Sequence, residues 1–170
     1  ANRANEILGA PLGARSPVHP NDHVNRGQSS NDVFPSALHM AVRVLADPLG
    51  EACGELQRAL EERAAAFADV VKLARTHLQD AVPMTLGQAF GGFASQIRHG
   101  RERLDRALPH VEELALGGTA VGTGLNSHPD FAVRVNGHLS GQAQVPLRPA
   151  PNRFEALAAR DALVAYMGTL

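Results

Sequence analysis

The sequence predicts an all-α protein in which long helices pack as a bundle. Over much of the 170-residue chain, apolar residues recur at three- and four-residue intervals, which is the period of a helix. No segment shows the sustained apolar–polar alternation of a half-buried strand. Glycine- and proline-rich stretches separate the periodic segments and hold most of the polar side chains. Functional residues are therefore expected in loops that a helical bundle holds in place.

The N-terminal part is expected to hold a helix end, a long loop and the first long helix. Residues 2–8 have the pattern of a helix that a glycine terminates. Residues 9–28 are rich in Gly, Pro and Asn, which predicts a loop. A helix is expected to begin near residues 30–32, where Ser and Asn can cap it. Pro48 is expected to end or kink that helix, and a second helical stretch is expected over 49–68.

One long helix is expected in the middle of the chain. It follows residues 70–83, which are predicted to be irregular or briefly extended. Thr85 and Gln88 form a T-x-x-Q capping box that would start the helix, and its periodicity continues to about residue 108. The Gly-Gly pair at 91–92 lies inside this helix, where glycine lowers stability. We therefore expect a neighbouring backbone to approach closely at that pair.

Shorter helices are expected in the C-terminal third. Residues 109–116 predict one short helix, and residues 117–129, which read "GGTAVGTGLNSHP", predict a glycine-rich loop. Two further helices are expected over 129–143 and 152–170, joined by the proline-rich "VPLRPAP". The chain opens without a methionine and stops within a helical pattern, which predicts that it is an internal piece of a longer protein.

Composition narrows the functional classes. The formal net charge of -1 gives no support for a nucleic-acid or membrane-surface partner. No apolar run approaches the roughly 20 residues that a membrane-spanning helix needs. The single cysteine excludes an internal disulfide and an iron–sulfur cluster. It is compatible with the reducing cytoplasm, where we expect the protein to act.

The polar stretch 28–32, "QSSND", lies where a helix is expected to begin. A helix N-terminus offers free N–H groups and the positive end of the helix dipole. The side chains of Ser29, Ser30 and Asn31 at that point are suited to bind a carboxylate or a phosphate. The alternative interpretation is that these residues only cap the helix.

A second polar stretch contains His77, directly after Arg75 and Thr76. A histidine in a loop between helices can act as a general acid or base. The alternative is a solvent-exposed histidine that takes no part in chemistry.

Other kinds of site have less support. His19 and His23 are four residues apart, as zinc ligands on a helix can be, but Pro20 between them opposes a regular helix. No HExxH motif or cysteine pair accompanies them, so we expect no metal. The glycine-rich loop lacks the Lys-Ser/Thr of a P-loop and follows a helix instead of a strand, which opposes a dinucleotide fold. A Ser–His hydrolase would need a G-x-S-x-G elbow, which is absent.

Four long stretches, taken together, resemble one known family. They read "HPNDHVN…QSSNDVFPSALHMA", "RTHLQDAVPMTLGQ", "ELALGGTAVGTGLNSHP" and "APNRFEALAARDALV". In this order, and covering essentially the whole chain, they resemble class II fumarate hydratase, the iron-independent fumarase of the fumarase/aspartase superfamily. Four such motifs are far more specific than any single glycine-rich loop.

Aspartases are the nearest alternative within that superfamily. They typically read QSTND in place of residues 28–32, glutamine in place of His77 and LGATA in place of residues 116–120. This chain has the fumarase residues at each of these places. Its departures from the usual fumarase pattern are Ala74, Ala89, Arg26 and Gly27.

The resemblance implies an all-α, long-helix bundle of the fumarase/aspartase type and the reversible, stereospecific hydration of fumarate to L-malate in the tricarboxylic acid cycle. The difficult species in this reaction is a doubly charged aci-carboxylate, which preorganised donors must stabilise as it forms. By resemblance, His77 is the catalytic proton donor or acceptor. The implied substrate-binding residues are Ser29, Ser30, Asn31 and Thr76, and the implied second dicarboxylate site consists of His19, Pro20, Asn21 and Asp22.

The resemblance also implies a homotetramer with active sites shared between chains, and it implies no cofactor. Residues 1–31 would be the end of an N-terminal region with its substrate-binding loops, and residues 32–170 would be part of the central helical-bundle domain. The family's GSSxMPxKxN loop is not in this sequence, so the 170-residue chain alone is expected to be inactive. The alternatives are an aspartase-like ammonia-lyase and a helical relative that serves as a non-catalytic scaffold.

Overall fold

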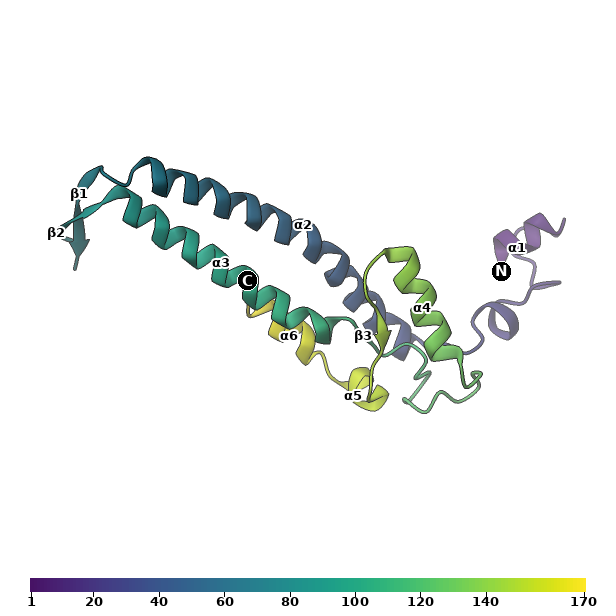
Figure 1. Ribbon diagram of the computed structural model, residues 1–170. Helices are drawn as coiled ribbons and strands as arrows, with labels where there is room; N and C mark the ends of the chain where they lie inside the picture. Colours follow the sequence, from purple (N-terminus) through teal and green to yellow (C-terminus); the bar gives the residue numbers. More distant parts are fainter. The chain divides into compact units, whose positions relative to one another are not determined.

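The computed structural model describes residues 1–170 and is built mainly of helices (Figure 1). The predicted all-α fold class is confirmed, because the strands are short and helices α2 and α3 dominate the chain. In chain order the elements are α1 (Asn2–Ile7), a π-helical turn η1 (Pro20–Val24), α2 (Ser30–Ala66), β1 (Val71–Thr76), β2 (Gln79–Thr85), α3 (Leu86–Val111), β3 (Glu113–Leu114), α4 (Phe131–Ala143), β4 (Arg148–Pro149), α5 (Arg153–Ala158) and α6 (Asp161–Met167).

The chain divides into two compact units. The first unit comprises Ala1–Val42 and His110–Asp161, and the second comprises Arg43–Pro109 and Ala162–Leu170. In the first unit, β3 pairs in parallel with β4, and the apolar core forms around this pair. The core residues are Leu114, Leu116, Val145 and Leu147, with Met40, Val135, Leu139 and Ala143 packed against them. The glycine-rich loop leaves this core directly after β3.

In the second unit, the C-terminal part of α2 and helix α3 run side by side (Figure 1). Arg101 of α3 donates to the side-chain oxygen of Gln57 at 3.1 Å. The rings of Phe67 and Phe90 lie 5.7 Å apart between their centres, and Phe90 meets Phe93 edge-on at 6.3 Å. Such aromatic contacts stabilise a helix pair beyond the apolar area that they bury.

The predicted starts of the long helices are confirmed. Helix α2 begins at Ser30, within the range expected. At the start of α3, the hydroxyl of Thr85 accepts from the Gln88 N–H at 3.1 Å, and the Gln88 side chain accepts from the Thr85 N–H at 2.9 Å. This reciprocal pair is the predicted capping box. The helices expected near 2–8 and 129–143 are also present, as α1 and α4.

Two helix boundaries expected at prolines are absent. At Pro48 an end or a kink is expected, and the end is wrong, because helix α2 runs through Pro48 for 37 residues. Residues 109–116 do not form a separate helix, because α3 continues through Pro109 and β3 follows. A proline in a helix removes one hydrogen bond and costs about 3 kcal/mol. A long helix with many remaining hydrogen bonds and packed neighbours can absorb that loss.

One helix is expected over residues 152–170, but the structure has two, α5 and α6. Asn152 caps α5 by accepting from the N–H groups of Phe154 and Glu155, at 3.0 and 3.1 Å. The chain becomes extended at Ala159, which ends α5. Arg160 donates to the carbonyls of Ala156 and Leu157, at 3.1 and 3.3 Å, and so satisfies the end of that helix. Helix α6 then begins at Asp161.

Within this chain, the close approach expected at the Gly-Gly pair 91–92 is absent. An added Cβ on Gly92 would meet nothing within 4 Å, and one on Gly91 would make only an ordinary contact, at 4.0 Å. The close approach occurs at Gly87, where an added Cβ would lie 2.5 Å from the carbonyl oxygen of Ala64 and 2.8 Å from Cα of Ala68. Gly87 therefore lets α3 start directly against the end of α2.

The segment predicted to be irregular or briefly extended forms a hairpin. Strands β1 and β2 pair antiparallel, from Val71 with Thr85 to Thr76 with Gln79. His77 and Leu78 form the two-residue turn, with φ values of 51° and 61°, as in a type I′ turn.

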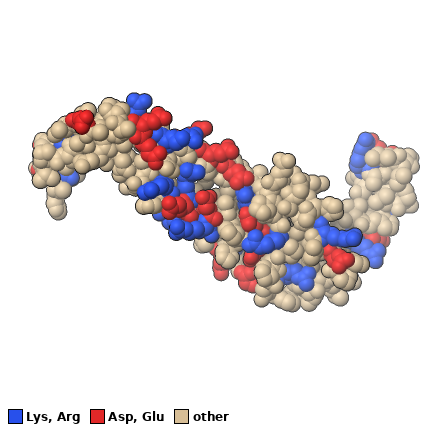
Figure 2. Space-filling view, viewed as in Figure 1, with Lys and Arg blue, Asp and Glu red and all other residues tan.

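The surface matches the balanced composition. On the face drawn in Figure 2, acidic and basic side chains are intermingled along the helices, in keeping with a formal net charge of -1. None of the helices combines the length and the apolar character that crossing a membrane requires.

Candidate functional site

The N-terminus of α2 is the first component of the candidate site. Ser29 precedes the helix, and its hydroxyl oxygen accepts from the Asn31 N–H at 3.2 Å. The backbone N–H of Ser29 donates in turn to Oδ1 of Asp32, at 2.8 Å. Ser29 therefore caps α2, as the alternative interpretation of this stretch proposed. Capping leaves the Ser29 O–H free to donate to a ligand, because a hydroxyl has one donor and two acceptor positions.

The glycine-rich loop is the second component, and Asp32 joins it to α2. Oδ2 of Asp32 accepts from the N–H groups of Gly117 and Thr119, at 3.1 and 2.8 Å. The side-chain amide of Asn31 donates to the Ala120 carbonyl at 2.8 Å. Segments that are more than 80 residues apart in the chain are thus fixed against each other by charge-assisted and neutral hydrogen bonds.

Glycine is required in this loop because the loop packs tightly and uses left-handed backbone. Gly117 has φ 97°, and an added Cβ there would lie 2.4 Å from Cβ of Ala132 in α4. Gly122 has φ 103°, and its Cβ would lie 2.7 Å from the Phe154 ring. Arg153 of α5 donates to the Gly117 carbonyl at 3.1 Å. Residues of helices α4 and α5 therefore pack against the loop and help to fix its shape.

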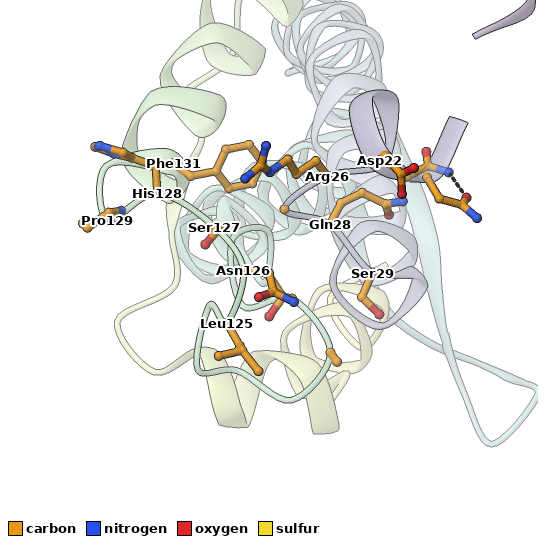
Figure 3. A pocket seen from close by; sticks show the side chains of 15 residues that line it. Asp22, Arg26, Gln28, Ser29, Leu125, Asn126, Ser127, His128, Pro129 and Phe131 are labelled. Carbon is orange, nitrogen blue, oxygen red and sulfur yellow. Dashed lines mark hydrogen bonds between the residues drawn. The ribbon is translucent and has the colours of Figure 1, made fainter. Parts of the chain in front are cut away.

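A cavity of about 1080 Å³ lies between these components. Figure 3 shows Arg26, Gln28 and Ser29 on one of its walls, with Asn126 and Ser127 facing them from the glycine-rich loop. Most lining groups are hydrogen-bonding side chains, so the cavity suits a small polar ligand. The complete lining is Asn21, Asp22, Asn25, Arg26, Gly27, Gln28, Ser29, Thr119, Ala120, Leu125, Asn126, Ser127, His128, Pro129 and Phe131.

The predicted second dicarboxylate segment forms the π-helical turn η1, and it enters the same cavity. The Asp22 N–H donates to His19 Nδ1 at 3.2 Å, and the His19 N–H donates to His23 Nδ1 at 2.9 Å. The two histidines are thus engaged in holding the turn. Asn21 and Asp22 line the cavity, whereas His19 and Pro20 lie in the turn outside its lining.

Asn5, which the sequence did not single out, fixes the loop that leads to this turn. Its side chain is completely buried. It accepts from the Val18 N–H at 2.7 Å and donates to the carbonyls of Val18 and Ala14, at 2.9 and 2.6 Å. A buried amide with all its partners satisfied rigidifies the segment that it crosses, and this segment ends directly before His19.

Thr76 and His77 lie in the second unit, at the end of the β1–β2 hairpin. Both side chains are exposed. Arg75 and Asp80, which face each other just behind the turn, form an ion pair of 3.4 Å. The hairpin therefore presents His77 to solvent on a short, defined turn. The structure groups Ser29, Asn21 and Asp22 around one cavity, with Ser30 and Asn31 adjacent to Ser29, and it places Thr76 and His77 in the other unit.

Sequence reasoning also missed Asp32 and Thr119. Thr119 is buried, and its hydroxyl has no hydrogen-bond partner, although the residue lines the cavity. The signal for Asp32 was its place three residues after Ser29, where an acid completes a capping box. No three histidine, cysteine, aspartate or glutamate side chains gather into a group that could hold a metal ion.

Comparison with known proteins places the chain in a family. A family model described as "Lyase" matches residues 1–170. The class II fumarate hydratases of Nitrosomonas europaea and Neisseria meningitidis are 57% and 55% identical to this chain over its whole length. The chain spans 37% of the length of each of these relatives.

Solved structures share the fold. A class II fumarase from Schistosoma mansoni matches with a TM-score of 0.92 at 36% identity, over 99% of this chain and 38% of that one. A Brucella melitensis protein described as fumarate lyase:delta crystallin, bound to cobalt, matches with a TM-score of 0.92 at 40% identity, over 99% of this chain and 37% of that one. By sequence over all 170 residues and by fold, the chain belongs to this lyase family.

Proposed function

We propose that the longer protein of which this chain is a part is a class II fumarate hydratase, which converts fumarate and L-malate into each other in the tricarboxylic acid cycle. The observation that carries the proposal is the arrangement at the N-terminus of α2. Hydroxyl and amide groups stand there at the positive end of a 37-residue helix, beside a polar cavity. Identities above 50% to proteins of that name over the whole chain support it.

The proposed substrate is a small dicarboxylate, and its charge explains why this arrangement suits it. Malate loses a proton from the carbon next to one carboxylate, and hydroxide then leaves the neighbouring carbon. The intermediate carries additional negative charge on that carboxylate. Ser29, Ser30 and Asn31 would donate hydrogen bonds to the dicarboxylate from a fixed capping geometry, which is the preorganisation that such charge requires.

Thr76 would add a further donor to the substrate, and His77 would give or take a proton. The exposed hairpin end is suited to reaching a site formed by other chains. We therefore include in the proposal a homotetramer with active sites shared between chains. Large apolar side chains exposed on α2, including Phe34 at 65%, Leu45 at 67% and Leu56 at 48%, support burial against partners.

The turn η1 is proposed as the second dicarboxylate site, with His19, Pro20, Asn21 and Asp22. The proposal also holds that residues 1–31 end an N-terminal region and that residues 32–170 belong to a central helical-bundle domain. The protein is proposed to act in the cytoplasm, which agrees with a single, unpaired cysteine, Cys53.

The proposal is tested on the longer protein, with His77 intact and with His77→Asn. Fumarate formation from L-malate is followed by absorbance without added metal. The parent should produce fumarate, and the variant should lose about 100-fold or more in rate, the usual contribution of a general acid or base. His99→Asn, at an exposed position of α3, is the matched control and should retain the parent rate.

The other candidate functions give different results in the same assay. If the parent is inert with malate but releases ammonia from aspartate, the aspartase-like alternative is correct. Inertness with both substrates would support the scaffold. Equal rates for the parent and His77→Asn would agree with the proposed reaction but would show that His77 takes no part in it.

A further inference from the structure

Asp32 is the most completely buried acidic side chain of the first unit, with none of its surface exposed. Both of its carboxylate oxygens accept hydrogen bonds from backbone N–H groups. Oδ1 accepts from Ser29, and Oδ2 accepts from Gly117 and Thr119. Asp32 does not line the cavity, so a ligand there would touch the groups that Asp32 holds and not Asp32 itself.

The groups on the α2 side of Asp32 are the proposed substrate-binding residues. Asp32 fixes the backbone of Ser29, whose hydroxyl is bonded in turn to the Asn31 N–H. The Asn31 side chain is bonded to the Ala120 carbonyl, one residue beyond Thr119. Asp32 therefore controls the separation between the substrate-binding segment and the loop that restrains Asn31.

The glycine-rich loop also depends on the Asp32 carboxylate. Gly117 and Thr119 are buried, and both have positive φ, 97° and 56°. Without a carboxylate in front of them, their N–H groups would be left buried without an acceptor, which is unfavourable. Arg153 donates to the Gly117 carbonyl at 3.1 Å. The backbone N–H of Gly117 is thus held by Asp32 and its carbonyl by Arg153.

We infer that Asp32 is a positioning residue for the fumarate hydratase reaction: it sets Ser29 and Asn31 in the geometry that binds the dicarboxylate, without contacting the dicarboxylate itself. The inference rests on the proposed function, since it concerns the same site. It assigns to Asp32 an effect on substrate affinity that burial and structural support alone would not give.

The test is Asp32→Asn in the longer protein, assayed with L-malate. The amide keeps the shape of the carboxylate but replaces one acceptor oxygen with a donor NH₂. In either orientation, at least one of the three backbone N–H groups then faces another donor. We expect KM to rise about tenfold, the effect of losing one well-placed hydrogen bond to a binding group, with a smaller change in kcat.

A double-mutant cycle with Asn31→Ala separates positioning from general support. If Asp32 acts through Asn31, Asp32→Asn should raise KM much less when Asn31 is already alanine. Ser36→Ala is the matched control. Its hydroxyl donates to the Asp32 carbonyl at 2.7 Å and is buried, so the variant removes a nearby buried hydrogen bond but leaves the carboxylate network intact. It should lower the melting temperature and leave KM unchanged.

The outcomes are distinct. A parent protein without malate activity overturns the proposed function together with this inference. An active parent with unchanged KM in Asp32→Asn, or with fully additive effects in the cycle, overturns the inference alone. If Asp32→Asn does not fold, Arg153→Gln tests the same loop through the Gly117 carbonyl, to which Arg153 donates. A raised KM in that folded variant supports the inference, and an unchanged KM contradicts it.

Discussion

At the scale of single residues, His39 makes stability depend on pH. The residue is 8% exposed, and Nδ1 lies 2.9 Å from the Val111 carbonyl oxygen. Burial lowers the pKa of His39 below its usual 6.5, because the charged ring is poorly solvated. Below pH 6.5 the unfolded chain gains a proton at this ring while the folded chain does not. The contribution of His39 to stability is therefore complete above pH 6.5 and falls as the pH drops toward the lowered pKa.

The measurement compares melting temperatures of the longer protein and its His39→Gln variant between pH 7.5 and 5.5. At the higher pH the variant should be less stable by about 1 kcal/mol, the usual value of one hydrogen bond. The difference should shrink as the pH falls. Parallel curves for the parent and His39→Gln would contradict the assignment.

At the scale of elements, Gly87 fixes how closely α3 begins against α2. Gly87→Ala should destabilise the protein by about 1–3 kcal/mol, the usual penalty for overpacking, because its Cβ would meet backbone atoms at 2.5 and 2.8 Å. Gly92→Ala, on the same helix, meets nothing within 4 Å and should stabilise by about 0.5–1 kcal/mol through helix propensity. Thermal melting of the two variants gives shifts of opposite sign, and equal shifts would refute this assignment.

The elements also show what the sequence can and cannot predict. Signals that act over three or four residues were read correctly, as at Thr85 with Gln88 and at the start of α2. Signals whose outcome depends on distant neighbours were not. An end or a kink is expected at Pro48 and a new helix at Pro109, although each lies inside a helix. Within this chain, the close approach is at Gly87 and not at 91–92.

In the candidate site, too, some residues can be predicted from the sequence and others depend on distant partners. The motif residues Ser29, Asn21 and Asp22 could be identified from the sequence, and the structure places them around one cavity. The short-range contact of Asp32 with Ser29 could be predicted from their spacing, but its contact with Gly117, 85 residues away, and that of Asn5 with Val18, 13 residues away, could not. A buried polar side chain shows its importance only when its partners are known. Most helices could therefore be predicted, but the hydrogen bonds that shape the site could not.

At the scale of the whole molecule, the 170-residue chain should not catalyse malate–fumarate conversion alone. It spans 37% of the length of relatives named class II fumarate hydratase, and His77 and Ser29 lie in separate units. The proposed active site requires further segments and other chains. The purified chain, assayed with malate beside the longer protein, should give no fumarate above the buffer background. Measurable turnover would show that a complete site forms without them.

The turn at the end of the hairpin has a consequence for protein engineering. His77 and Leu78 both adopt left-handed backbone, which is unfavourable by about 1 kcal/mol or more for such residues. An engineer seeking a higher melting temperature would choose Asn-Gly, the dipeptide that this turn prefers, and would thereby delete the proposed catalytic side chain. The stability of the turn thus favours Asn-Gly at positions 77 and 78, whereas the proposed chemistry needs His77. Leu78→Gly would stabilise the turn without removing the proposed catalytic residue, because it relaxes one strained position and leaves His77 in place.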